Sequence, residues 1–383
     1  MSDYLRLAEE NGVLLVTLDD PSGRANRTTA QFKDAFGALL DRIGATHAMP
    51  RGLILLSAKA SFGTGGDIAE MMGEAGRGGD DSFADSQRLK ALFRRVEKLG
   101  CPVVALIEGT AAGGGWELAL ACHARFSLPG DAIRLGLPEV ALGLVPGGGG
   151  LQRLPHWLGA RAAGRLIAQG LLQTPSAAMA EGLIDGLAPD RAALVERAMA
   201  FIAANPAPVA PWDRPGHRPP DCERHDGPIA DTQAARLALD AIGAIASAVF
   251  DDGAAIESEL FARCATSPAA RALIGLRFVD RNTLRRRPAD PAWSAAFTER
   301  LRETGPSPEA QARAALGQLR ASAVLSAAAA NVASVEAGFP AEQGGVLRFI
   351  ATGGLGPLAA EDERRLAAVE AADRDILEQA AAG

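Results

Sequence analysis

The sequence predicts an α/β fold with a parallel sheet, followed by a mostly helical C-terminal region. The first observation is a repeated alternation in which a short apolar run, such as 53–57 or 102–107, leads into a glycine-rich turn and then a helical pattern. The second is that the chain beyond about residue 231 is rich in Ala, Leu and Arg at helical spacing. A third is that 48% of residues are hydrophobic while only 5% are aromatic, which is typical of helices packed closely on a sheet.

The first hundred residues read as strand and helix in alternation. The run Val13–Leu18 predicts a strand, which ends at the turn signal 19–23. Thr28 or Thr29 can cap the helix that follows, because apolar residues recur at helical spacing up to Ile43. The expected elements after it are a buried strand at 53–57, a glycine turn at 62–67, a helix through 72, a loop over 73–85 and a helix at 86–99.

The rest of the chain divides into three predicted regions: a catalytic core over 1–205, a proline-rich linker over 206–230, and a helical region over 231–383. In the core, a buried strand at 102–107 leads through the turn 109–115 into a helix. Seven prolines between 206 and 228 exclude helix or central strand from the linker. Later helices are expected at 151–158, 160–169, 175–181, 191–204, 232–250, 254–265, 268–280, 308–330 and 360–381.

Composition also limits the partners. The formal charge of −7 gives no general attraction for nucleic acid or anionic lipid, so neither a nucleic acid nor a membrane is expected as a partner. No apolar run reaches membrane-spanning length and the N-terminus has no signal-like apolar segment, which favours the cytoplasm. The four cysteines and five histidines lack metal-ligand spacing, so we expect no metal site.

Two glycine turns each follow a predicted strand and open a predicted helix. Backbone N–H groups at a helix start have no partner within the helix, and the helix dipole favours negative charge there. The N–H groups of Gly66 and Gly114 could therefore hold a carbonyl oxygen that gains negative charge, as in an oxyanion hole. The alternative is that these glycines only allow tight packing of strand on helix.

Two glutamates lie in unusually apolar surroundings. Glu117 falls in the first turn of the helix opened by the second glycine turn, and Glu139 follows Pro138 within the apolar stretch 135–142. Burying an unpaired carboxylate is costly, so such a group is either exposed by a loop or kept for chemistry. Paired carboxyls in an apolar cleft can act as acid and base. The structural alternatives are a charge at a helix start for Glu117 and a cap for Glu139.

Three segments together resemble the enoyl-CoA hydratase (crotonase) family. They are FGTGGDI at 62–68, IEGTAAGGGWELALAC at 107–122 and LGLPEVALGLVPGGGGLQRL at 135–154, in the order and about the spacing typical of that family. The resemblance covers roughly residues 10–205 and is closest to the hydratase half of the bacterial multifunctional fatty-acid oxidation α-subunit. It implies a spiral of ββα units with a further helical region, assembled as trimers or pairs of trimers.

The resemblance also implies a function: hydration of a 2-enoyl-CoA in fatty-acid β-oxidation. Gly66 and Gly114 would bind the thioester oxygen, Glu139 would be the main acid/base, and Glu117 would orient the water. The acyl-CoA is substrate, and no metal or redox cofactor is implied. The positions expected to contact CoA are Arg24, Ala25, Gly63, Asp67 and Ile68, with a solvated surface position as the alternative for Arg24.

Several points depart from the family or stay open. Ala69 stands where many relatives carry a basic residue, and the bulky Trp116 would either narrow the acyl pocket or fill core. The same scaffold could catalyse isomerisation, thioester hydrolysis or C–C cleavage, because function belongs to the site rather than the fold. A non-catalytic scaffold is the other alternative. After 206 the likeness is weaker, and the dehydrogenase domain of the multifunctional enzymes is not expected here.

Overall fold

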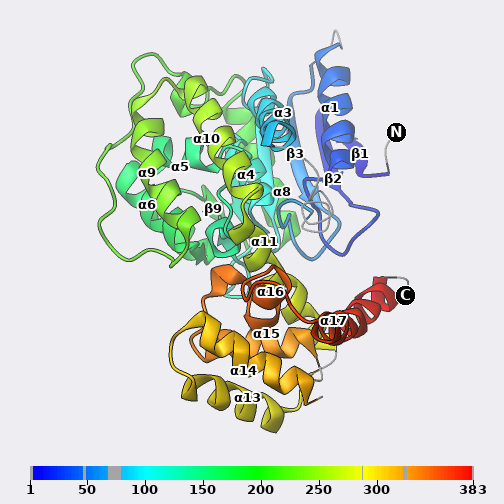
Figure 1. The fold of residues 1–383 in the computed structure, drawn as a ribbon. Coiled ribbons are helices and arrows are strands. Elements are labelled where there is room, and N and C mark those ends of the chain that lie inside the picture. Colours follow the sequence, from blue (N-terminus) through cyan, green and yellow to red (C-terminus); the bar gives the residue numbers. More distant parts are fainter. Residues whose placement is uncertain (1–2, 46–48, 68–78, 287, 322–325, 382–383) are drawn as a thin grey trace. The chain divides into compact units, whose positions relative to one another are not determined.

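The computed structural model describes residues 3–45, 49–67, 79–286, 288–321 and 326–381. They form two compact units, Met1–Ala265 and Thr266–Gly383 (Figure 1). The α/β class with an additional helical region is confirmed. The expected helix from 68 through 72 and the first part of the expected loop over 73–85 lie outside the described residues. The rest of that loop was predicted wrongly: residues 79–85 are helical and form the start of α3 (Gly79–Glu97), where Asp80 and Asp81 place negative charge in the first turn of the helix.

The first unit contains a sheet in which six described strands lie in the order β1-β2-β3-β4-β6-β9. β1 and β2 are antiparallel, and the remaining neighbours are parallel. A strand at β1 was not expected, because its charged residues mask the apolar alternation. The strand bounds are β1 Leu5–Glu10, β2 Val13–Leu18, β3 Gly52–Ser57, β4 Val103–Ile107, β6 Ala124–Ser127 and β9 Gly186–Leu187.

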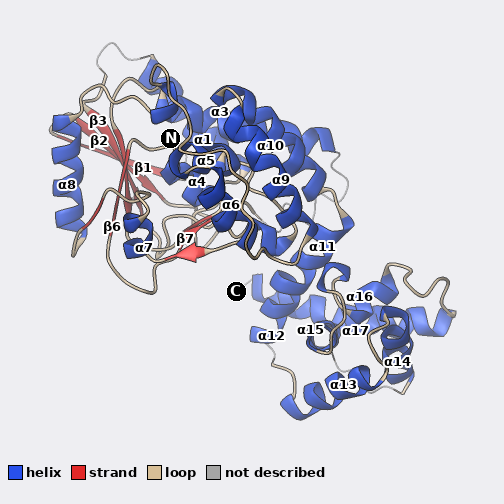
Figure 2. Cartoon of the chain, turned by 90° about the vertical axis from the view of Figure 1, so that its left-hand side faces the viewer, coloured by secondary structure: helices blue, strands red, loops and turns tan. Residues whose placement is uncertain are grey.

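Helices cover both faces of this sheet (Figure 2). Successive strand residues point to opposite faces, so Leu53 and Leu55 of β3 join one core while Ile54 and Leu56 join another. On the Ile54 side lies α8 (Arg191–Ala204). On the Leu53 side lie α1 (Ala30–Gly44), α3 (Gly79–Glu97) and α4 (Gly114–Leu120).

A second, small sheet joins the loops near the carboxyl ends of the large sheet's strands. Its order is β5-β7-β8, from Ala111–Ala112, Leu135–Gly136 and Leu172–Gln173. An isolated bridge pairs Gly63 with Ala111, which ties the first glycine turn to the second. The remaining elements of this unit up to residue 204 are the 3₁₀ turn η1 (Glu139–Leu142), α5 (Gly150–Leu158), α6 (Ala160–Gln169) and α7 (Pro175–Ala180).

The boundary between the units differs from the one expected from sequence. Helices α9 (Gln233–Ser247) and α10 (Phe250–Ala265), placed by the sequence in the C-terminal region, pack in the first unit, α9 on α6 and α10 on α3. The proline-rich segment stays on this unit, where Trp212 of the 3₁₀ turn η2 (Pro211–Asp213) is buried. Proline density there signals irregular backbone rather than a domain boundary.

The second unit is helical throughout its described residues. Its core contains Phe297, Leu301, Leu316 and Leu347. The expected helix over 308–330 is two helices, because Ser326 starts a new one by capping the Ala329 N–H. The bounds are α11 Pro268–Ile274, a π-helical turn Gly275–Asp280, α12 Arg281–Arg286, α13 Pro291–Glu303, α14 Pro308–Arg320, α15 Ala327–Glu336, a 3₁₀ turn Ala341–Gln343, α16 Val346–Ala351 and α17 Ala360–Ala381.

Candidate active site

One cavity in the first unit brings together the four residues that the sequence singled out for catalysis. It has a volume of about 280 Å³. Gly66, Gly114, Glu117 and Glu139 all line it. They come from the first glycine turn, the start and first turn of α4, and the start of η1. The parallel strands β3 and β4 explain this meeting, since segments that leave their carboxyl ends emerge at one edge of the sheet.

Two backbone donors face this cavity from the glycine turns. Gly114 is the first residue of α4, so its N–H has no partner one turn earlier in the helix. Within the described part of the chain, neither Gly66 nor Gly114 donates its N–H to another protein group. The two turns touch, because a Cβ built on Gly65 would lie 3.6 Å from the Gly114 nitrogen. The pair can therefore donate two hydrogen bonds to a ligand oxygen.

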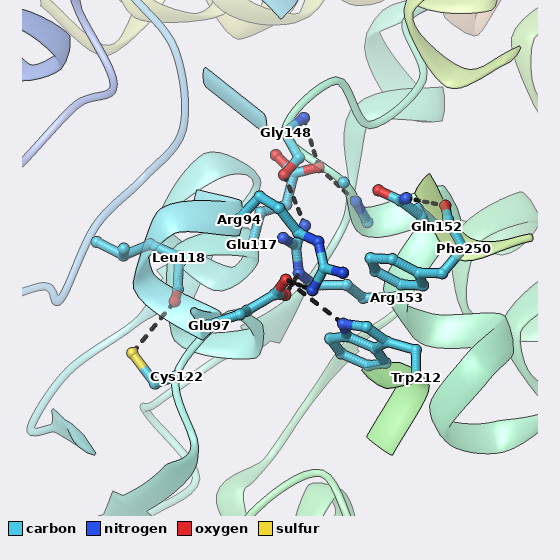
Figure 3. Close-up of polar contacts among 12 residues, drawn as sticks. Arg94, Glu97, Glu117, Leu118, Cys122, Gly148, Gln152, Arg153, Trp212 and Phe250 are labelled. Carbon is cyan, nitrogen blue, oxygen red and sulfur yellow. Dashed lines mark hydrogen bonds and ion pairs between the residues drawn. The ribbon is translucent and has the colours of Figure 1, made fainter. Parts of the chain in front are cut away.

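Glu117 is buried and held by backbone amides. Its Oε1 accepts hydrogen bonds from the N–H groups of Gly148 and Gly150, each at 2.8 Å (Figure 3). Desolvation by burial raises the pKa of Glu117, the nearby carboxyl of Glu257 adds to the rise, and the two amides lower it. The carboxyl group thus keeps a fixed orientation while its proton affinity is increased.

Glu139 has a different environment. Its Oε2 is buried and has no hydrogen-bond partner among the described residues. Its Oε1 lies over the second glycine turn, where a Cβ built on Gly113 would be 2.8 Å away. Burial raises the pKa of Glu139 well above its usual value, and the negative charge of Glu117 raises it further. Such a carboxyl favours its neutral, protonated form and has an oxygen available to a ligand.

The turn that holds Glu117, called here the glycine corner (Gly147–Gly150), is bonded on several sides. Ser86 of α3 donates to the Gly147 carbonyl at 2.6 Å, and Arg153 donates to the Gly148 carbonyl at 3.1 Å. Gly149 has a φ of +106°, and an added Cβ would lie 1.8 Å from Arg153 Nη1. Only glycine fits this position without strain, which explains the glycine run before α5.

A buried ion pair fixes Arg153 beneath the corner. Its Nε lies 2.6 Å from Glu97 Oε1, and both side chains are only 1% exposed (Figure 3). Glu97 also accepts hydrogen bonds from Arg94 at 2.8 Å and from Trp212 at 3.4 Å. The proline-rich segment thus contributes to the support of the site through Trp212.

Sequence reasoning missed four residues at or beneath this site. Lys33 of α1 lines the cavity and pairs with Asp85, and Phe261 of α10 lines it as well. Lys90 of α3 and Glu257 of α10 are 4% and 0% exposed just behind it. Lys33, Lys90 and Glu257 lie on the apolar faces of their helices, so a charge at a core position was the signal available in the sequence.

The residues expected to contact CoA are not all near the cavity. Asp67 lines it and pairs with Arg27. Arg24 is exposed and Ala25 half-buried, and neither lines the cavity. Gly63 instead lies behind the wall, where an added Cβ would meet the Gly115 Cα at 2.9 Å. Ile68 and Ala69 lie outside the described residues.

Trp116 belongs to the core and not to the cavity wall. It is 1% exposed and packs in the cluster on the Leu53 side of the sheet. Among the described residues, no cluster of three or more His, Cys, Asp or Glu could hold a metal ion. None of the described helices is both long and apolar enough to cross a bilayer.

Comparison with known proteins gives one consistent result. The sequence model of the enoyl-CoA hydratase/isomerase family matches residues 8–206, which is more than half of the chain. A fatty acid oxidation complex subunit alpha from Shewanella amazonensis is 38% identical over 207 residues, or 54% of this chain and 29% of that protein. The same subunit from Shewanella baltica is 39% identical over 204 residues, or 52% and 28%. The matches thus span less than a third of each relative.

A solved structure shares the fold. The enoyl-CoA hydratase from Bacillus halodurans superposes with a TM-score of 0.55 at 19% identity, covering 71% of this chain and 99% of the other. At this identity the likeness bears on the fold only.

Proposed function

Because the chain belongs to the enoyl-CoA hydratase/isomerase family, we propose that it acts on an acyl-CoA thioester and adds water across the C2=C3 bond of a 2-enoyl-CoA. One observation carries the proposal. The buried Glu117, the half-buried Glu139 and the backbone N–H groups of Gly66 and Gly114, which donate to no group in the described part of the chain, border a single cavity. Hydration of an alkene conjugated to a thioester requires this combination of two proton-transfer groups and an oxyanion site.

The amide pair supplies the electrostatic part of catalysis. As a nucleophile adds to C3, negative charge moves onto the thioester oxygen. Hydrogen bonds from Gly66 and Gly114 stabilise that charge more strongly than the ground-state carbonyl, and loss of one such donor typically costs about 3–4 kcal/mol of barrier. Both donors belong to the backbone of linked turns, so they need no reorganisation during the reaction.

The two carboxyl groups carry out the two proton transfers, one from the water and one to C2. Water between them forms its C–O bond to C3 while one carboxylate accepts a water proton, and a carboxyl donates a proton to C2. The net change is addition of H and OH. We assign Glu139 the main acid/base role, because its Oε2 bonds no group among the described residues and its raised pKa suits a proton donor. Glu117, fixed by two amides, suits the orientation of the water.

The proposed reaction involves the CoA thioester as substrate and no step that calls for a metal or redox cofactor. We further propose fatty-acid oxidation as the context, the cytoplasm as the compartment, and a homo-oligomer, trimer or hexamer, as the assembly. The likeness to fatty acid oxidation complex subunits supports the first of these.

Isomerisation is the second candidate, and one observation favours it. A double-bond shift needs a single carboxylate to move a proton between C2 and C4, and the Oε2 of Glu139, which has no hydrogen-bond partner among the described residues, could serve as that group. The two reactions separate by substrate: an isomerase consumes a 3-enoyl-CoA, whereas a hydratase consumes crotonyl-CoA, which already carries the C2=C3 bond.

The test is to incubate the purified protein with crotonyl-CoA, longer 2-enoyl-CoAs and a 3-enoyl-CoA while following the enoyl absorbance. We expect loss of the 2-enoyl signal and a fall in kcat of about 10²–10⁴-fold in Glu139→Gln. The exposed Glu196→Gln on α8 serves as the matched control and should retain full activity. Absence of turnover on short, medium and ring-bearing 2-enoyl-CoAs would refute hydration.

A further inference from the structure

A further carboxylate, Glu257, lies close to the proposed catalytic pair. Glu257 belongs to α10, outside the segment that matches the family model, and its side chain is fully buried. Burial of a carboxylate requires partners that compensate the lost hydration. The partners of Glu257 lie in the glycine corner, in the first turn of α5 and on α3.

Both carboxylate oxygens of Glu257 bind the backbone at the start of α5. Oε1 accepts a hydrogen bond from the Gly149 N–H at 2.5 Å, and Oε2 accepts one from the Gln152 N–H at 3.0 Å. The amides on either side of Gly149 point the other way and hold Glu117. Consecutive amides of one short turn thus donate alternately to two glutamates from different helices.

A buried cation balances this carboxylate. Lys90 Nζ lies 3.9 Å from Glu257 Oε1 and donates to the Ala254 carbonyl one turn earlier in α10. The other charged groups that face Glu257 are Arg153 from α5, Glu117 from α4 and Glu139 from η1. The position of Glu257 is therefore determined by α3 and α5 together, while its charge is felt by both proposed catalytic carboxyls.

We propose that Glu257 is a positioning residue for the reaction: by gripping Gly149 and Gln152 it fixes the corner whose neighbouring amides orient the Glu117 carboxylate. The inference rests on the proposed function. Glutamine at this position has one acceptor oxygen instead of two, so it can accept from only one of the Gly149 and Gln152 amides while its NH2 group faces the other. The corner can then rotate so that Gly148 and Gly150 no longer point together at Glu117. The orientation of the attacking water would then be lost.

A purely structural role predicts something different. If Glu257 only capped α5, its replacement would lower stability without altering kcat of the folded fraction or its pH dependence. As a positioning residue it affects a step after substrate binding, so kcat should fall while KM changes little. Removing its negative charge should also lower the pKa of Glu117, because repulsion by Glu257 raises that pKa.

The experiment compares Glu257→Gln and Glu257→Asp with Glu259→Gln, an exposed position on the same helix. With crotonyl-CoA we expect kcat of Glu257→Gln to fall on the order of 10- to 100-fold at nearly constant KM. In a plot of kcat against pH, the acidic limb of Glu257→Gln should lie at lower pH than that of the wild type, because the pKa of Glu117 is lowered. Glu257→Asp keeps the charge and should recover part of the rate without the shift in the profile. Glu259→Gln should match the wild type.

Hydrogen exchange of the peptide covering 147–152 gives a readout that does not depend on activity. Exchange should be faster in Glu257→Gln than in Glu259→Gln. If a folded Glu257→Gln shows unchanged exchange, kcat and pH profile, the positioning role is refuted. If the wild type hydrates no enoyl-CoA but exchange over 147–152 is still faster in Glu257→Gln, the proposed function is refuted. The structural claim that Glu257 holds the glycine corner would then still stand. Should Glu257→Gln not fold, the test is made with Glu257→Asp, whose shorter side chain should lower kcat and speed exchange over 147–152 relative to Glu259→Gln; unchanged kcat and exchange in Glu257→Asp would then refute the positioning role.

Discussion

Glu117 and Glu257 accept hydrogen bonds from interleaved amides of the glycine corner and the first turn of α5, Glu117 from Gly148 and Gly150, and Glu257 from Gly149 and Gln152. The two carboxylates come from α4 and α10, which are far apart in sequence. The glycine corner thus connects α4, which carries Glu117, to α10, which carries Glu257. Several measurable properties depend on it.

The first prediction concerns stability and pH. The pKa of Glu139 is raised in the folded protein by burial and by Glu117. A carboxyl with a raised folded pKa stabilises the fold below its unfolded value of about 4.3 and loses that contribution as pH rises through the folded pKa. Glu139→Gln cannot ionise, so its melting temperature relative to wild type should increase as the pH rises above the unfolded pKa of about 4.3 toward neutral pH.

Thermal melts of both proteins across this range check the slope. Each 1 kcal/mol gained in the free energy of unfolding raises the melting temperature by roughly 2–4 °C for a unit of this size. The exposed Glu196→Gln should show a constant difference from wild type. A constant difference for Glu139→Gln as well would contradict the raised pKa.

The second prediction concerns Gly149. Alanine there combines a φ of +106° with a Cβ placed 1.8 Å from Arg153 Nη1. The backbone strain costs about 1–2 kcal/mol, and displacement of a buried side chain adds roughly 1–3 kcal/mol. Gly216→Ala is the matched control, since its φ is +77° but no atom lies within 4 Å of an added Cβ. Denaturant unfolding should show a clearly larger loss for Gly149→Ala; equal losses would exclude the clash.

The third prediction concerns the Glu97–Arg153 pair. Arg153→Met leaves the buried Glu97 carboxylate with Arg94 and Trp212 as its remaining partners, so it should lower the free energy of unfolding by about 1–3 kcal/mol. The double variant Glu97→Gln/Arg153→Met should lose less than the sum of the single losses. By contrast, Arg224→Met breaks an exposed pair with Asp240 and should cost no more than about 1 kcal/mol. Strict additivity at Glu97 and Arg153 would argue against a buried pair.

The fourth prediction concerns substrate length and rests on the proposed function. The Phe261 ring lines the cavity and lies against Gly147. Phe261→Ala should enlarge the cavity and raise the ratio of kcat/KM for longer over shorter 2-enoyl-CoAs by roughly 10-fold. Phe201→Ala, on the opposite face of the sheet, controls for general destabilisation. A ratio unchanged in Phe261→Ala would place the acyl chain elsewhere.

The sequence predicted the parts of this protein that depend on local pattern. Buried parallel strands such as 53–57 and 102–107 are continuous apolar runs, and the glycine turns that follow them mark the edge where Glu117 and Glu139 meet. The strand at Leu5–Glu10 is not predicted by the sequence, because only one of its faces is apolar and its charged residues mask the alternation.

The rest depended on tertiary contacts that no local pattern encodes. The helical periodicity of 254–265 predicted α10, but nothing in it indicated that Glu257 would reach the amides of α5. The seven prolines within 206–230 predict a separating linker, although the chain there stays bonded to the rest of the first unit through contacts such as the Ala230 N–H to the Ala168 carbonyl. A long-range hydrogen bond leaves no signature in the residues that make it.

The edge position of β1 has a consequence for how the purified protein behaves at high concentration. An unpaired strand edge is a template on which another chain can add, leading to aggregation. β1 carries Arg6, Glu9 and Glu10, all of them exposed. At the other edge β9 is only two residues long. Both borders of the sheet are therefore poor nuclei for fibril-like stacking between molecules.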